Sequence, residues 1–418
     1  MQDQQQRLQL IEASLSLSYE LLNEELRGRW RWLAVFPDSF ADDAAAAVWE
    51  VETEQAQLTL GELIAASMME WNENADRYRL HDLARLFADS KLSAEEYAVG
   101  HKRHATRYRD VLAVADIFYL EGGNALARGL ALVDLEWPNI QAGHAWVAAQ
   151  GVEAGEEVVQ LGMTYPDAGV YVLNLRLRQR EWIRWLEIAV GAARRLNHRQ
   201  CEGDALGNLA TAYKDLGEIQ RAIQFYEQAL LIDRELGDRR GEGVDLGNLG
   251  NAYSDLGETQ RAIQFYEQHL SIARELGYRR GEGIALGNLG NAYAQLGETQ
   301  RAIQFYEQAL LIHRELGDRR GEGNVLGNLG GAYMNLGETQ RAIQFYEQRL
   351  TIAREIGDRI GEGTALWNMS LALDRLGQRA RAIQYAEQSL AIHEQTEDPF
   401  APKVRAALAA WREESGHN

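Results

Sequence analysis

Apolar residues recur at helical spacing through the second half of the chain. Residues 246–272 carry two apolar stripes whose members lie three or four positions apart, as one face of an α-helix requires. The first stripe consists of Leu246, Leu249, Tyr253 and Leu256. The second consists of Ala262, Ile263, Tyr266, Leu270 and Ile272. Gly257 and Gly277 follow the stripes and suit the left-handed conformation that ends a helix, so the pattern predicts a pair of helices.

The helix pair recurs along the chain. The string QRAIQFYEQ occurs at residues 220–228, 260–268, 300–308 and 340–348, always 40 residues apart. Because neither helix of a pair can bury its stripe alone, each repeat is stable only against its neighbours. We therefore expect residues 202–396 to form five 40-residue repeats of an all-α solenoid.

Polar and small residues in the repeats have predictable structural roles. Asp238, Asp318 and Asp358 stand where the next helix needs an N-cap, although Tyr278 breaks the series. Gly250 and Ala262 are expected where paired helices approach closely.

The first 154 residues lack the repeat. Helices are predicted over residues 15–22, 25–36, 44–51, 58–66 and 82–89, with a hairpin at 68–71 and 77–80 around a polar turn. We expect five regions: a small helical domain with one hairpin at 1–92, a helical bridge at 93–154, a divergent repeat at 155–201, the five repeats at 202–396, and a capping helix and tail at 397–418.

The repeat motif carries a family resemblance. Its residue order, Leu-Gly-Asn-Leu-Gly-Asn-Ala-Tyr, then Leu-Gly-Glu, then Ala-Ile-x-x-Tyr-Glu, resembles the tetratricopeptide repeat. The 40-residue period and the linker Glu-Leu-Gly-Asp-Arg-Arg resemble the longer repeats of spindle-orientation adaptors and, more loosely, kinesin light chains. The resemblance implies a right-handed α-solenoid whose first helices line a concave groove that binds an extended peptide or partner segment.

The N-terminal motifs resemble a second family. Ser16-Leu17-Ser18-Tyr19, Leu33 to Pro37 and Arg79-Leu80-His81-Asp82-Leu83 are similar to the winged-helix subdomain of STAND signalling ATPases of the NB-ARC type. The resemblance implies a nucleotide-sensing role for His81 and Asp82; the simpler alternative is a histidine that starts a helix. The chain has no GxxxxGK[ST] phosphate loop, so a nucleotide-binding domain would have to be supplied elsewhere. The chain resembles the C-terminal half of such a protein, either as a short gene or as a truncated piece.

Candidate binding residues are those that differ between the otherwise copied repeats. They follow the second glycine of the motif or lie one helical turn further on. The predicted peptide-binding groove consists of Thr211, Lys214, Asn251, Ser254, Asp255, Asn291, Gln295, Asn335 and Arg375. The side chains of Asn251 and Asn291 could bond alternate peptide groups of an extended partner, or they could simply be solvated. The pairs that begin with Arg239, Arg279 and Arg319 could bind acidic side chains of a partner or neighbouring glutamates on the solenoid.

Composition narrows the function classes. The net charge of −19 argues against a nucleic-acid partner, so DNA binding through the winged helix is the weakest alternative. Cys201 is the only cysteine, and no apolar run reaches the length of about 18 residues that a membrane span needs, so we expect a soluble cytoplasmic protein. No spacing indicates a catalytic centre or cofactor, and His101 and His104 are expected on a solvated helix face rather than at a metal. The sequence thus favours a non-enzymatic interaction scaffold; the alternative is the sensor half of a STAND-type switch.

Overall fold

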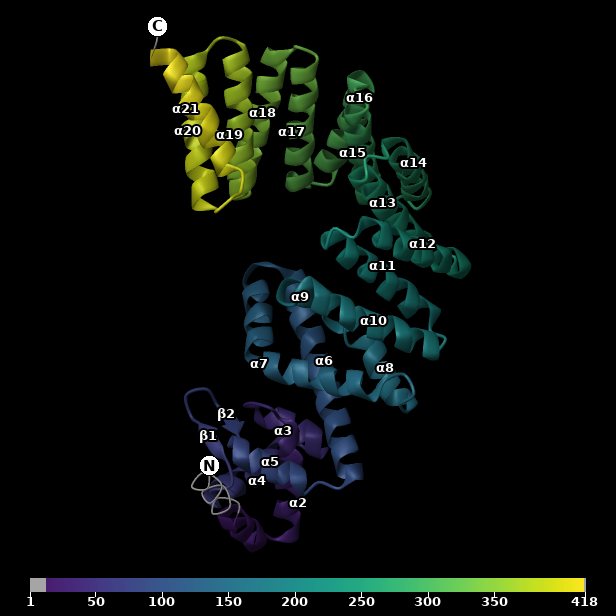
Figure 1. Ribbon diagram of the computed structural model, residues 1–418, viewed down its shortest axis with the longest axis vertical. Coiled ribbons are helices and arrows are strands. Elements are labelled where there is room, and N and C mark those ends of the chain that lie inside the picture. Colours follow the sequence, from purple (N-terminus) through teal and green to yellow (C-terminus); the bar gives the residue numbers. More distant parts are fainter. Residues whose placement is uncertain (1–12, 417–418) are drawn as a thin grey trace, which may run out of the picture. The chain divides into compact units, whose positions relative to one another are not determined.

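The computed structural model describes residues 13–416, which divide into two compact units, one ending at Leu216 and one starting at Gly217 (Figure 1). The start of the predicted first domain (1–12) and the end of the tail (417–418) lie outside the described residues. Helices dominate both units, and the described residues contain one small two-stranded sheet. The predicted all-α class with a single hairpin is confirmed.

The first unit begins with short helices around a hairpin. Residues 13–21 are helical. The next elements are α2 (Glu24–Trp32), η1 (Leu33–Val35), α3 (Asp42–Trp49), α4 (Thr53–Ala65), β1 (Glu70–Asn72), β2 (Arg77–Arg79) and α5 (Asp82–Ser90). The strands pair antiparallel, with Trp71 opposite Tyr78. Trp30, Phe40 and Leu60 are fully buried and form part of the core between these elements.

Two 28-residue helices follow, α6 (Ala94–Glu121) and α7 (Gly123–Gln150), and they pack against each other along their lengths. Ser93 and Glu96 start α6 with a capping box, in which each side chain accepts a hydrogen bond from the other's backbone N–H. The unit ends with α8 (Glu156–Thr164), η2 (Asp167–Gly169), α9 (Val170–Arg176), α10 (Gln179–Arg195) and α11 (Arg199–Asp215).

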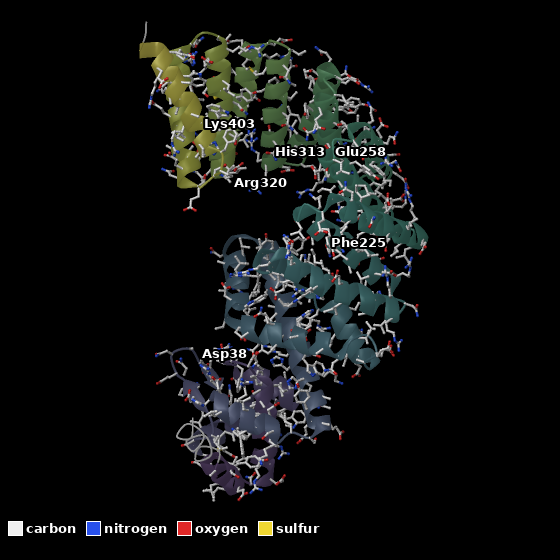
Figure 2. The ribbon with its side chains drawn as sticks, viewed as in Figure 1. Asp38, Phe225, Glu258, His313, Arg320 and Lys403 are labelled. Carbon is white, nitrogen blue, oxygen red and sulfur yellow. The ribbon has the colours of Figure 1, made fainter. Side chains whose placement is uncertain are left out.

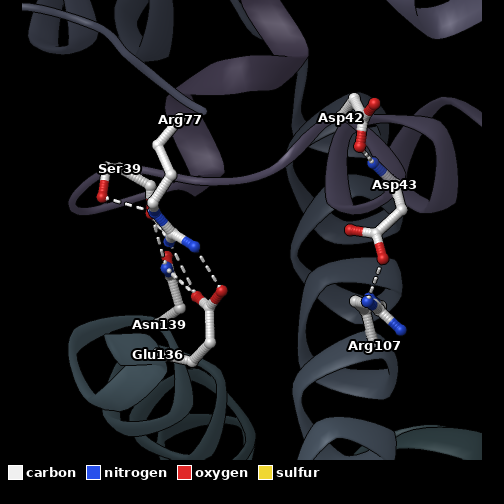
Figure 3. Close-up of polar contacts among 7 residues, drawn as sticks. All are labelled: Ser39, Asp42, Asp43, Arg77, Arg107, Glu136 and Asn139. Carbon is white, nitrogen blue, oxygen red and sulfur yellow. Dashed lines mark hydrogen bonds and ion pairs between the residues drawn. The ribbon is translucent and has the colours of Figure 1, made fainter. Parts of the chain in front are cut away.

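A buried polar cluster joins the hairpin to α7 (Figure 3). Arg77 on β2 donates to both carboxylate oxygens of Glu136, at 2.5 and 2.9 Å, and also to the side chain and carbonyl of Ser39. Asn139, one turn after Glu136, donates to the Ser39 carbonyl at 2.9 Å. Burial alone lowers the pKa of Arg77, but the bonds and charge of Glu136 outweigh it and raise the pKa above its usual value.

The second unit is a row of helix pairs (Figure 1). Its elements are α12 (Ile219–Leu236), α13 (Arg239–Asp255), α14 (Thr259–Glu275), α15 (Arg279–Gln295), α16 (Thr299–Glu315), α17 (Arg319–Asn335), α18 (Thr339–Glu355), α19 (Arg359–Arg375), α20 (Arg379–Gln395) and α21 (Ala401–Gly416). Each helix packs against the next one along the chain. The expected solenoid of helix pairs is therefore present within this unit.

The predicted helix ends are confirmed. Gly257 and Gly277 adopt positive φ angles of 77° and 62°. Asp238, Asp318 and Asp358 cap their helices by accepting a hydrogen bond from the backbone N–H three residues later, whereas Tyr278 makes no side-chain cap bond.

The copied tyrosines explain the copied glycines. A Cβ on Gly250 would lie 2.6 Å from Cδ1 of Tyr266, so the ring of the second helix fills the space that a larger residue would need. The second, third and fourth repeats have this glycine, whereas the first has Ala210 and keeps the tyrosine as Tyr226. In the fifth repeat, Ser370 stands at the glycine position and Ala386 replaces the tyrosine. The two replacements compensate each other, and both residues are fully buried.

The last helix covers the end of the array. On α21, Val404, Leu408 and Trp411 are buried. The Trp411 ring stacks near that of Trp367 on α19, with centroids 5.9 Å apart. The predicted capping helix is thus in place, with Pro402 in its first turn, where proline is tolerated.

Candidate interaction surface on the repeats

A ladder of ion pairs recurs along the second unit. In the first copy, the guanidinium of Arg234 lies 2.8 Å from Glu242, whose carboxylate also pairs with Arg239. Arg239 then pairs with Glu275, 36 residues further on. The same arrangement recurs around Glu282 and Glu322.

The arginine pairs were expected either to bind acidic side chains of a partner or to pair with neighbouring glutamates. The ladder decides between these alternatives for the first arginine of each pair. The first arginine of each pair, as at Arg239, Arg279 and Arg319, bonds neighbouring glutamates and stabilises the scaffold. The second arginine is placed differently. Arg240 lies over the Tyr278 ring, and Arg320 is exposed at the start of α17 (Figure 2). Only the second arginines remain candidates for contact with a partner.

One side of α15 is unlike the rest of the repeat surface. Ile284, Gly287, Asn291 and Gln295 follow one another at steps of three or four residues and therefore share one side of the helix. Ile284 is 45% exposed. A Cβ on Gly287 would meet nothing within 4 Å, so the helix backbone there borders open space. We call this side of α15, together with the equivalent side of the first helix in each other repeat, the first-helix stripe.

On the neighbouring first helices the corresponding glycines are covered. On α13, Val244 is 50% exposed like Ile284, but a Cβ on Gly247 would lie 2.9 Å from the His269 ring. On α17, the space beside Gly327 is occupied by the guanidinium of Arg349. The residue opposite Gly287 is Ala309, too short to reach it. Among α13, α15 and α17, the space beside this glycine is therefore open only on α15.

The two predicted groove asparagines are linked to the scaffold. The side-chain oxygen of Asn251 accepts hydrogen bonds from the Tyr266 hydroxyl at 2.9 Å and the Asn288 amide at 3.4 Å. That of Asn291 accepts from the Tyr306 hydroxyl at 2.7 Å and from Asn328 at 2.9 Å. Burial raises the pKa of both tyrosines to about 12, so their hydroxyls are donors at neutral pH. The amide nitrogens of Asn251 and Asn291 donate no hydrogen bond within residues 13–416.

The other predicted groove residues are spread over five helices, α11, α13, α15, α17 and α19. Ser254 and Thr259 both approach the Gln295 side-chain oxygen at 3.4 Å. Arg375 donates to the Met334 carbonyl at 2.8 Å. Asp255 and Asn335 are exposed. Thr211 and Lys214 lie on α11, in the first unit, where Thr211 bonds the Gly207 carbonyl.

Reasoning from the sequence missed Val244, Ile284 and Gly287. Val244 and Ile284 could have been recognised from the sequence, because their position varies between repeats. The five repeats have Asp204, Val244, Ile284, Asn324 and Thr364 there. The openness at Gly287 had no such signal, because glycine recurs at this position in four repeats and only the facing residue distinguishes them.

His81 and Asp82, the residues that the resemblance to STAND ATPases singled out, have local partners. The side chain of His81 accepts from the Leu83 N–H at 3.3 Å and starts α5, and Asp82 pairs with Arg79 at 3.6 Å. The solvated helix face expected for His104 is wrong. That ring is 1% exposed, packs edge-on against Phe36, and burial lowers its pKa to about 3. The expectation overlooked that α6 is covered by the preceding domain.

Residues 13–416 contain neither a candidate metal site nor a candidate membrane span. No group of three or more His, Cys, Asp or Glu side chains in residues 13–416 is arranged to hold a metal ion. Over the same residues, no helix is both long and apolar enough to cross a bilayer.

The family model of the tetratricopeptide repeat matches residues 201–275, 281–355 and 321–395. These are tetratricopeptide repeats. The match covers the array in which the ion-pair ladder and the first-helix stripe occur, and tetratricopeptide repeats generally serve as scaffolds for protein interaction. No curated protein matches the chain.

Several solved structures are similar in fold. A signal transduction ATPase with numerous domains (STAND) and a tetratricopeptide repeat sensor, from Pyrococcus horikoshii, is 18% identical, with a TM-score of 0.51 over 95% of this chain and 61% of that one. This chain therefore spans about three fifths of that protein's length. Aspartyl phosphate phosphatase F from Bacillus subtilis is 12% identical, with a TM-score of 0.51 over 94% and 95% of the two chains. BtubC from P. vanneervenii is 22% identical, with a TM-score of 0.48 over 53% and 93%. At these identities the likenesses concern the fold alone.

Proposed function

We propose that this protein is a non-enzymatic interaction scaffold that binds an extended segment of a partner protein along the first-helix stripe of its tetratricopeptide repeats. The observation that carries the proposal is on α15, where exposed Ile284, uncovered Gly287 and exposed Asn291 lie in line. Elsewhere in the repeats the large apolar residues are mostly buried and the charged residues are mostly paired with one another.

The stripe defines the chemistry of the partner. An apolar side chain of the partner would contact Val244 and Ile284 and enter the space beside Gly287. A peptide carbonyl nearby would accept a hydrogen bond from the amide nitrogen of Asn291 or Asn251. Because the oxygens of these asparagines already serve the tyrosines, the amide groups are held in one orientation and pay little entropy on binding.

A matched pair of substitutions tests the proposal. Peptides are first selected on the full chain from a displayed library, and their affinities are measured by fluorescence anisotropy. Ile284→Glu should weaken the selected peptides at least about tenfold, the effect of losing a central apolar anchor. Leu311→Glu makes the same change at a residue that is 66% exposed on α16, a second helix, and should leave binding unchanged. Equal effects of the two variants would refute binding along the stripe.

A steric variant sharpens the test without touching the core. Gly287→Phe places a ring in the open space beside α15 and should block the partner. Ser271→Phe adds the same ring at an exposed position of α14 and should not. Neither variant should lower the melting temperature of the parent protein.

The second candidate function is the sensor half of a STAND-type switch, in which the repeats detect a ligand and the N-terminal domain, as a winged helix, relays it to a nucleotide-binding domain. It is supported by the likeness of fold to the Pyrococcus horikoshii protein over 95% of this chain, and by the buried Arg77–Glu136 cluster that could carry a relay between the hairpin and α7. The DNA sequence upstream of the Met1 codon tests it. A nucleotide-binding segment in frame or in an adjacent gene is expected, and its absence would contradict this candidate.

A further inference from the structure

A pocket of about 490 Å³ lies in the first unit, away from the repeats that match the family. It is bounded by the end of α7, by α8 and by the middle of α10. Its volume falls within the range of about 300–1,000 Å³ that small-molecule sites occupy. No part of the proposed interaction surface contributes to it.

The pocket exists because two helices here carry glycines and one of them is short. α8 has nine residues, whereas the first helices of the copied repeats have seventeen. Gly162 on α8 and Gly191 on α10 both line the pocket and present no side chain to fill it. A Cβ on Gly191 would have one neighbour within 4 Å, Cγ1 of Val152 at 3.4 Å. The space between the helices is thus left open by the sequence.

The lining is apolar apart from two side chains on α10. Val147, Val152, Val158 and Ile188 contribute branched aliphatic groups, and Val152 is 40% exposed at its position after α7. A lining of this kind favours an aliphatic or aromatic group, whose transfer from water is favourable by about 25 cal/mol per Å² of apolar surface.

The two polar residues are Arg184 and Glu187. Glu187 accepts a hydrogen bond from the Tyr213 hydroxyl at 3.1 Å, which holds its carboxylate toward α11. Arg184 is exposed and has no recorded hydrogen bond or ion pair within residues 13–416. A single guanidinium at an apolar pocket matches one carboxylate, with which it forms a bidentate pair, whereas a phosphate-rich ligand would need several cations.

We propose that this pocket binds a small apolar molecule with one carboxylate, its apolar body between α8 and α10 and its carboxylate at Arg184. Such a ligand would contact α7, α8 and α10 at once. Binding would therefore raise the melting temperature of the first unit, since a ligand that binds only the folded state stabilises it.

The experiment is calorimetric titration of the full chain with octanoate, 1-octanol and octylammonium, which share one apolar chain and differ in charge. Octanoate should bind at a single saturable site, 1-octanol should bind more weakly, and octylammonium more weakly still. Arg184→Gln should lower the octanoate affinity about threefold to fivefold, the effect of an ion pair at an exposed site, and leave 1-octanol unchanged. Arg180→Gln removes the same charge one turn earlier on α10, outside the pocket, and should change neither.

Two filling variants test the location. Gly191→Leu and Val158→Phe place side chains in the pocket from different helices and should each abolish binding of octanoate and 1-octanol. Circular dichroism and melting temperatures establish whether each variant folds. If one variant does not fold, the other is enough to test the location of the site. The proposal is overturned if octanoate does not saturate, if octylammonium binds as well as octanoate, or if a folded filling variant binds octanoate like the parent.

Discussion

The tetratricopeptide repeats and the helices that precede them stabilise the chain in different ways. In the repeats, the ion-pair ladder has copies 40 residues apart, as Glu242, Glu282 and Glu322 show with their pairs of arginines. In the first unit, the Arg77–Glu136 cluster occurs once, and it is buried, with the two side chains 6% and 9% exposed. These three glutamates are 7–12% exposed but their arginines are 38–51% exposed, so one pair can be lost locally at small cost, whereas a single pair buried on both sides supports a whole junction.

The largest expected effect is at that junction. Glu136→Ala leaves the Arg77 guanidinium buried without its carboxylate and should lower the free energy of unfolding of the first unit by about 3–5 kcal/mol. Asp134→Ala, two residues earlier on α7, breaks the exposed pair with Arg176 and should cost less than about 1 kcal/mol. Urea unfolding followed by tryptophan fluorescence measures both. Similar losses for the two variants would remove the distinction between the regions.

The next largest effect is expected at acid pH, which should destabilise the first unit more than the second. Burial lowers the pKa of His104 and of His144, both in the first unit, to about 3. Their folded pKa lies below the unfolded value, so the stability they contribute is complete above pH 6.5 and is lost as the pH falls from 6.5 toward 3. Each should remove about 1.4 kcal/mol per pH unit in that window.

Hydrogen exchange between pH 7 and pH 5 checks this order. Amides in α6 and α7 should lose protection before those in α15 to α18. His144→Gln removes one titrating group and should flatten the pH dependence of the first unit. Earlier loss in the repeats would contradict the assignment of the acid-sensitive groups.

Gly287 and Gly290 lie one turn apart on α15, the first beside open space and the second against a packed ring. Gly290→Ala places a Cβ 2.5 Å from Cδ1 of Tyr306 and should destabilise the second unit by about 1–3 kcal/mol, as overpacking does. Gly287→Ala meets nothing within 4 Å and should stabilise it by about 0.5–1 kcal/mol through helix propensity. Thermal melting monitored by circular dichroism decides the signs, and a loss of stability in Gly287→Ala would show that the space beside α15 is filled.

Most of the repeat architecture could be predicted from the sequence because the same residue types recur at equivalent positions of several repeats. The caps at Asp238 and Asp318, the glycine helix ends and the covering helix with Trp411 follow from local rules of spacing and capping. The Arg77–Glu136 pair could not be predicted, since its members lie 59 residues apart and meet only through tertiary packing.

The candidate site was predictable in part. Variation between copied repeats pointed to Asn251 and Asn291, and the same variation marks Ile284. The bonds of the asparagine oxygens to Tyr266 and Tyr306 depend on how two helices of a repeat face each other, which spacing alone does not state. For that reason a change of these asparagines to alanine would disturb the scaffold as well as any bound partner, and Ile284 and Gly287 are the cleaner positions for testing binding.

The smallest expected effect lies on the repeated ladder. Arg319→Gln removes one of the two arginines at Glu322, while Arg314 remains at 2.8 Å, so the carboxylate keeps a partner. Because Arg319 is 38% exposed, the loss should be about 0.2–1 kcal/mol, and it should shrink in 1 M salt, where the screening length falls to about 3 Å. Arg320→Gln makes the same change at the next residue, which has no recorded ion pair within the described chain, and should have no effect at either salt concentration. Chemical denaturation of both variants in low and high salt measures the difference. A loss in Arg319→Gln as large as that in Glu136→Ala would mean that the ladder acts as one cooperative network, and that the repeats depend on single contacts as much as the junction does.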